Sequence, residues 1–125
     1  MTESRLYQLY IKKWLDKQGC FYCRVEHTHI PDIYTCKNGV VTWYELKVID
    51  TIPSNKQLRP DWRVGQLAWI KDHHSKGGSN ESIKLILWVK DAWFILEPKQ
   101  SYSLEELNGR AGQCSTRVRD VLQRD

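Results

Sequence analysis

The dipeptide Asn38-Gly39, between two runs rich in aromatic and β-branched residues, constrains the fold of this chain more than any other feature. An Asn-Gly pair in this setting is the strongest short-range signal for a β-hairpin, because a type I′ turn requires positive φ at both central residues. A two-residue turn pairs Lys37 with Val40. Counting outward along both strands then places Asp32 directly opposite Glu45.

The predicted hairpin therefore sets two carboxylates face to face, with Cβ atoms about 4.5–5.5 Å apart. Lys47 lies two residues beyond Glu45 and projects from the same face of the strand. Because like charges directly opposed across a strand pair are destabilising, the pair needs a divalent cation, a raised pKa on one acid or the nearby lysine. Mg²⁺ fits the first option, since it binds one or two carboxylates together with phosphate oxygens. A metal that activates water beside a lysine suits phosphodiester hydrolysis.

A plainer interpretation is a surface hairpin that carries an ordinary cluster of solvated charges. An error of one residue in the turn register would also move Asp32 to the other face of the hairpin. The acids, however, stand at the ends of otherwise apolar and aromatic strands, which favours a site over a solvated face.

The remaining elements follow from apolar periodicity and from turn residues. A first helix is capped by Thr2 and stopped by Gly19. A polar connector at residues 51–58 follows the hairpin. We expect strands at 21–25, 82–89 and 92–96, a helix from 60 to 73 or 74, and short helices near 104–107 and 118–122. The order α-β-β-β-α-β-β-α predicts an α/β fold with a mixed central β-sheet flanked by helices.

Pro31-Asp32 followed by Glu45-Leu46-Lys47 resembles the signature of the PD-(D/E)XK nucleases. The span from Glu3 to about Pro98 also resembles the small archaeal and viral Holliday-junction resolvases and the VRR-NUC nucleases. This resemblance implies a restriction-endonuclease-like core. The segment at 92–95 matches the last core strand of the resolvases.

The resemblance also implies roles for particular residues. Asp32 and Glu45 would bind the metal, Mg²⁺ or Mn²⁺, together with the Leu46 carbonyl and Glu3. Lys47 would orient or help to deprotonate the attacking water, and Gln66 would steady Lys47 or a scissile phosphate. Glu3 has a second explanation, because an acid in the first turn of a helix is expected on dipole grounds alone.

One segment departs from the resolvase pattern. Residues 26–29 (Glu26-His27-Thr28-His29) replace the glycine-serine loop that is common before the aspartate in resolvases. Glu26 is therefore an alternative to Glu3 as the additional carboxylate. His27 and His29 are either phosphate or metal contacts, or simply exposed loop residues.

Basic residues near these motifs are candidates for neutralising DNA phosphates, although solvated basic faces explain any single one as well. The DNA-binding candidates are Arg5, Lys56, Arg59, Arg63 and Lys71. Trp62 is a candidate for stacking on an unpaired base or for a dimer interface. The formal charge of +4 permits a polyanionic partner without demanding one.

Together these observations predict a Mg²⁺- or Mn²⁺-dependent, structure-selective DNA endonuclease that acts on branched or duplex DNA. Residues 1–125 would form one nuclease domain, with a core at about 3–98 and a helical, basic extension at 99–125. We expect a homodimer, since one small domain has one active site, and a soluble cytoplasmic protein with no membrane association. The minimal size is compatible with a phage-encoded enzyme.

Two other classes of function remain open at this point. One is a nucleic-acid-binding protein of the same fold without catalysis. The other is a zinc-stabilised interaction module built on Cys20, Cys23, His27 and His29, residue types that bind zinc but lack a second paired motif.

Overall fold

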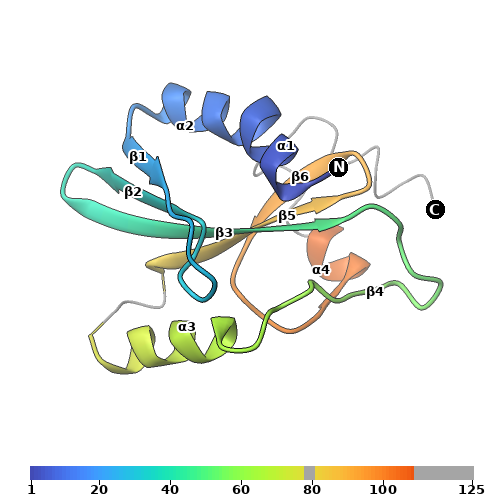
Figure 1. Cartoon of the computed structure of the whole chain (residues 1–125). Coiled ribbons are helices and arrows are strands. Elements are labelled where there is room, and N and C mark those ends of the chain that lie inside the picture. Colours follow the sequence, from blue (N-terminus) through green and yellow to red (C-terminus); the bar gives the residue numbers. More distant parts are fainter. Residues whose placement is uncertain (78–80, 109–125) are drawn as a thin grey trace.

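A mixed five-stranded sheet forms the centre of the molecule, as the order of elements predicts (Figure 1). The computed structural model describes residues 1–77 and 81–108. The strand order is β1-β2-β3-β5-β6, where β3 and β5 are parallel and the other neighbours are antiparallel. The strands are β1 (Phe21–Arg24), β2 (Ile33–Lys37), β3 (Val40–Ile49), β5 (Ile83–Val89) and β6 (Ala92–Leu96).

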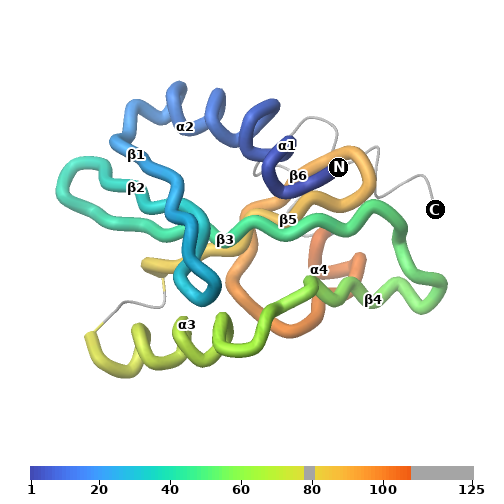
Figure 2. Tube along the Cα trace, in the orientation of Figure 1, coloured from blue at the N-terminus to red at the C-terminus, as the bar shows by residue number. Residues whose placement is uncertain are grey.

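Helices cover both faces of this sheet, which gives three layers (Figures 1 and 2). The N-terminal helical segment consists of α1 (Glu3–Leu6), η1 (Tyr7–Ile11) and α2 (Lys12–Gln18), and it lies on one face. On the other face lie α3 (Gln66–Ser75) and α4 (Leu104–Asn108). The buried apolar residues accordingly form two clusters, one on each face of the sheet. Alternate side chains of β5 belong to one cluster and to the other. In the described part of the chain, no helix is long and apolar enough to cross a membrane.

The caps of the N-terminal helical segment are those predicted. The Thr2 hydroxyl accepts a hydrogen bond from the Arg5 N–H at 3.1 Å, and Gly19 ends the segment at φ 68°. Within it, η1 is a π-helical stretch with wider hydrogen-bonded turns, which the apolar periodicity did not reveal.

The hairpin has the predicted register. Lys37 pairs with Val40 and Ile33 pairs with Tyr44, while Asn38 and Gly39 have φ values of 51° and 80°. Ile33 and Tyr44 are the last residues paired through the backbone, so Asp32 and Glu45 occupy the next position beyond the paired strands. The second hairpin, between β5 and β6, is also confirmed, and Lys90 takes positive φ in its turn.

Three expectations need correction or completion. The helix predicted to begin at residue 60 begins at Gln66, because the chain before it makes separate turns and Gly65 adopts φ 95°. The connector and the chain after β6 hold a small two-stranded sheet that was not predicted, formed by β4 (Gln57–Leu58) and β7 (Tyr102–Ser103). The helix expected near 118–122 lies outside the described residues.

Candidate active site

The site lies at the fork where β2 leaves β3. Their backbone pairing ends at Ile33 and Tyr44. At the next position the carboxylate of Asp32 continues it, because Oδ2 accepts a hydrogen bond from the N–H of Leu46 at 2.9 Å. The carbonyl of Asp32 accepts a second bond from the N–H of Val25 at 2.7 Å. The aspartate is therefore fixed by backbone on both sides.

Glu45 and Lys47 enter the site from one face of β3. Leu46 between them belongs to the apolar cluster under the N-terminal helical segment, so its two neighbours point to the side of α3. Both are almost fully buried, Glu45 with 2% and Lys47 with 5% of its surface exposed. Charged side chains are rarely buried to this degree unless they are paired, which marks the position as specialised.

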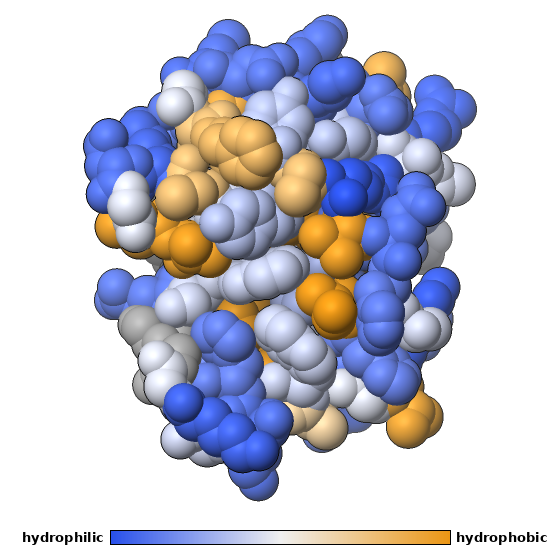
Figure 3. Space-filling model, turned by 60° about the vertical axis from the view of Figure 1, so that its left-hand side comes forward, coloured by the Kyte–Doolittle hydropathy of each residue, from blue (hydrophilic) through white to orange (hydrophobic). Residues whose placement is uncertain are grey.

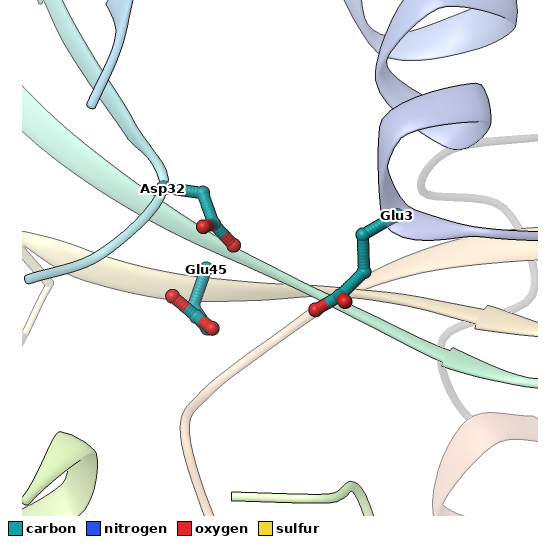
Figure 4. A group of neighbouring side chains, drawn as sticks. All are labelled: Glu3, Asp32 and Glu45. Atoms are coloured by element: carbon teal, nitrogen blue, oxygen red, sulfur yellow. The ribbon is translucent and has the colours of Figure 1, made fainter. Parts of the chain in front are cut away.

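Three carboxylates meet at the fork. Oxygen atoms of Glu3, Asp32 and Glu45 all lie within 4.8 Å of one another. Figure 4 shows that these side chains come from α1, from the loop before β2 and from β3, and point toward a common space. A donor set of carboxylate oxygens suits a hard divalent cation such as Mg²⁺ or Mn²⁺. The residues present therefore fit the metal that the sequence resemblance implies.

The electrostatics of the cluster reflect its crowding. Burial and, to a smaller extent, the neighbouring Asp32 raise the pKa of Glu45 to about 8, against the opposing effect of Lys47. Burial also raises the pKa of Glu3, while Lys47 counteracts that shift. Near neutral pH the cation-free cluster therefore retains a proton, which a bound cation would replace.

Lys47 and Gln66 form a buried network beside the carboxylates. The Lys47 ammonium donates to the carbonyl of Asp61 at 2.7 Å and to Oε1 of Gln66 at 2.9 Å, and it lies 3.4 Å from Oε2 of Glu45. Gln66 in turn donates from Nε2 to Oε2 of Glu45 at 2.9 Å. Its Oε1 also accepts from the N–H of Arg63 at 2.7 Å, which fixes the orientation of the amide.

Some contacts in this environment could not be predicted from the sequence. Trp62 places its ring 5.4 Å from the Lys47 ammonium and donates from Nε1 to the carbonyl of Lys99 at 2.8 Å. It is half-buried against the apolar cluster and covers Lys47, which neither sequence hypothesis for this tryptophan included. The Asp61 carbonyl and the charge of Arg24, which lowers the pKa of Glu3, were also missed.

The structure distinguishes the two candidates for the third carboxylate and does not assemble a zinc site. Glu3 lies in the cluster, whereas Glu26 is exposed in the loop before β2. Among the described residues, the groups suited to hold a metal do not include the set Cys20, Cys23, His27 and His29. The imidazole of His29 instead packs against Gly65 at the start of α3.

The basic candidates are exposed but do not share one location. Arg63 lies near the carboxylates, since its charge lowers the pKa of Glu3, and Arg5 follows Glu3 on α1. Lys56 and Arg59 belong to the connection between β3 and α3. Lys71 lines a hollow with Leu67, His74 and Pro98.

Comparison with solved structures agrees with this architecture. The chain is similar to the Holliday junction resolvase Hjc of the archaeal hyperthermophile Archaeoglobus fulgidus, with a TM-score of 0.53 and 16% sequence identity. The similarity covers 79% of this chain and 80% of the resolvase. No protein-family profile and no curated protein sequence matches the chain. The restriction-endonuclease-like fold expected from the sequence is therefore confirmed at the level of architecture.

Proposed function

We propose that this chain is a divalent-metal-dependent DNA endonuclease that hydrolyses phosphodiester bonds at the fork between β2 and β3. The observation that carries the proposal is the convergence of Glu3, Asp32 and Glu45 within 4.8 Å, beside a buried lysine. The fold shared with a protein named as a Holliday junction resolvase supports the same class of reaction, because a Holliday junction is a branched DNA.

The carboxylates would hold Mg²⁺ or Mn²⁺, with the carbonyl of Leu46 as a further ligand. When bound, the ion lowers the pKa of water and neutralises charge on the attacked phosphate. Lys47 is held beside Glu45 by Asp61 and Gln66, so its ammonium would stand next to a phosphodiester bound at the carboxylates. Its role is to orient the attacking water and to stabilise the developing negative charge.

Gln66 acts as a positioning residue in this proposal. It is buried and connects Glu45 with Lys47 through the two ends of its amide. A displacement of Glu45 or of Lys47 would therefore also shift the other side chain through Gln66. Arg63, exposed beside the cluster, would contact the phosphates that flank the cleaved bond, and the exposed Arg5 on α1 is a second candidate for such a contact.

We further propose a structure-selective substrate preference and a homodimeric enzyme. One domain carries one set of these residues, so paired cuts across a junction require two copies. The resemblance to the VRR-NUC group stays a prediction.

A cleavage panel tests the proposal. The purified chain is incubated with Mg²⁺ or Mn²⁺ and with linear duplex, flap, splayed-arm, four-way-junction and single-stranded DNA. We expect cleavage of at least one branched DNA, none in EDTA, and none by Asp32→Asn. The absence of cleavage on every DNA with either ion would contradict the proposal.

A further inference from the structure

A row of aromatic rings extends from the candidate active site along the same face of the sheet. Each of three site residues has an aromatic neighbour two or three positions away in the sequence: Tyr34 follows Asp32, Trp43 precedes Glu45 and Trp69 follows Gln66. The two-residue steps on the strands and the three-residue step on α3 keep each aromatic side chain on the face of its site residue. The row therefore starts two residues, about 7 Å along the strands, from Asp32 and Glu45.

The rings of this row contact one another across β1, β2, β3 and α3. Ring centroids of Tyr34 and Trp43 lie 5.3 Å apart, those of Trp43 and Trp69 5.8 Å, and those of Trp69 and His73 5.4 Å in a stacked pair. Phe21 extends the row on β1, 6.3 Å from Tyr34, and it is 66% exposed. The aromatic row is defined here as Phe21, Tyr34, Trp43, Trp69 and His73.

The aromatic row remains accessible. Tyr34, Trp43, Trp69 and His73 are all partly exposed, in contrast to the closed clusters on the two faces of the sheet. Figure 3 looks at this side of the molecule and shows pale and orange side chains gathered in the middle of the face, with blue, hydrophilic ones around them. At the end of α3, a hollow of about 420 Å³ opens beside Trp69 and His73.

Charged groups stand at both ends of the aromatic row. The hollow is also lined by Lys76 and Asp72, and this carboxylate is paired with Lys76 at 3.1 Å. Nδ1 of His73 is buried without a hydrogen-bond partner among the described residues. At the opposite end stands the exposed Arg63, beside the site. A strand that runs along the row would thus meet rings for its bases and, at the end beside the site, the guanidinium of Arg63 for its phosphates.

We infer that the aromatic row binds unpaired bases of a single-stranded DNA arm that leads into the active site. Stacking on aromatic side chains is the common means of binding single strands, because every base offers a π-face. The inference rests on the proposed function and narrows its substrate class to DNA with a splayed or flapped strand next to the cleaved bond.

The test compares two fluorescein-labelled splayed-arm DNAs that differ only in the arm nucleotides next to the duplex, which are normal in one and abasic in the other. Binding is measured by anisotropy in Mg²⁺ with Lys47→Ala, which prevents cleavage during the measurement. We expect the abasic arm to bind about 5- to 150-fold more weakly, the range for base–aromatic stacking. Trp69→Leu should reduce this difference, and Trp69→Tyr should restore part of it.

Matched variants keep the test interpretable. Trp43→Leu provides a second position in the row if Trp69→Leu fails to fold, which circular dichroism reports. Tyr10→Ala is the control: Tyr10 is also partly exposed, but it stacks on Trp88 on the opposite face of the sheet, and its variant should keep the full difference.

Two results would overturn the inference. If the Lys47→Ala protein binds normal and abasic arms with equal affinity, base stacking is excluded. This holds even if the wild-type chain cleaves DNA. Loss of self-association by Trp69→Leu in sedimentation, with the abasic difference unchanged, would instead make the row an interface between copies. Stacking without cleavage of any DNA by the wild-type chain would contradict only the proposed function.

Discussion

The ammonium of Lys47 lies 3.4 Å from Oε2 of Glu45, and both side chains are buried. This buried ion pair is not isolated, since Gln66 hydrogen-bonds to both partners. A buried ion pair contributes little to the stability of a fold, because desolvation of both groups offsets much of the Coulombic gain. Its location beside two further carboxylates is better explained by chemistry at this point.

Lys47→Ala should lower cleavage by about 10²- to 10⁴-fold, the range for the loss of a positioned catalytic group, while DNA binding persists. Single-turnover rates and anisotropy measure the two effects. Lys37→Ala, which removes an exposed lysine at the end of the same hairpin, is the control and should cleave normally. Full activity of Lys47→Ala would remove this lysine from the mechanism.

Asp32→Asn should abolish cleavage without lowering the stability of the metal-free protein. An asparagine oxygen can still accept the hydrogen bond from Leu46, and the repulsion with Glu45 is removed. Above pH 8, where Glu45 is ionised in the wild type, the variant should gain up to about 1 kcal/mol. Urea unfolding in EDTA at pH 9 measures this, and a clear loss of stability there would show that the aspartate is structural.

Glu45 should make the metal-free fold less stable as the pH rises. Its folded pKa of about 8 lies above the ordinary 4.5, so the protonated form favours the fold. The stabilisation is complete below pH 4.5 and is lost as the pH rises through 8, an effect on the order of a few kcal/mol. Urea unfolding across this range should show the slope in the wild type and a flatter profile in Glu45→Gln. Identical pH profiles of the wild type and Glu45→Gln would contradict a raised pKa of Glu45 in the folded protein.

Gly65→Ala should displace His29. A Cβ at Gly65 would lie 2.9 Å from the imidazole of His29, whereas one at Gly19 would meet nothing within 4 Å. Both glycines have positive φ, so each alanine variant should lose about 1–2 kcal/mol from the backbone alone. The imidazole signals of His29 in NMR spectra should shift in Gly65→Ala and stay unchanged in Gly19→Ala. Unshifted signals in both variants would mean that this loop does not rest on α3.

The hairpin and the first helix were predictable because their signals are local. Asn38-Gly39 determines the turn, and the turn determines which residues face each other along both strands. The same argument brought Asp32 toward Glu45 and placed Lys47 on the same face. Thr2 and Gly19 marked the two ends of the first helix for equally local reasons.

The remaining features depend on contacts between distant segments. Pro60 is a good first residue of a helix, yet the helix starts at Gln66, because the carbonyl of Asp61 is used by Lys47 and Gly65 breaks the helical path. The strands β4 and β7 have two residues each and pair only across the folded chain. The cover that Trp62 provides over Lys47 likewise has no counterpart in sequence spacing.

The central claim is that a divalent cation binds between the carboxylates at the fork of β2 and β3. The most direct measurement is anomalous X-ray scattering from crystals of the wild-type protein grown with Mn²⁺. We predict a manganese peak in direct contact with both Asp32 and Glu45. Crystals that bind Mn²⁺ elsewhere, or whose Asp32 and Glu45 side chains point away from each other with the fork empty, would contradict it.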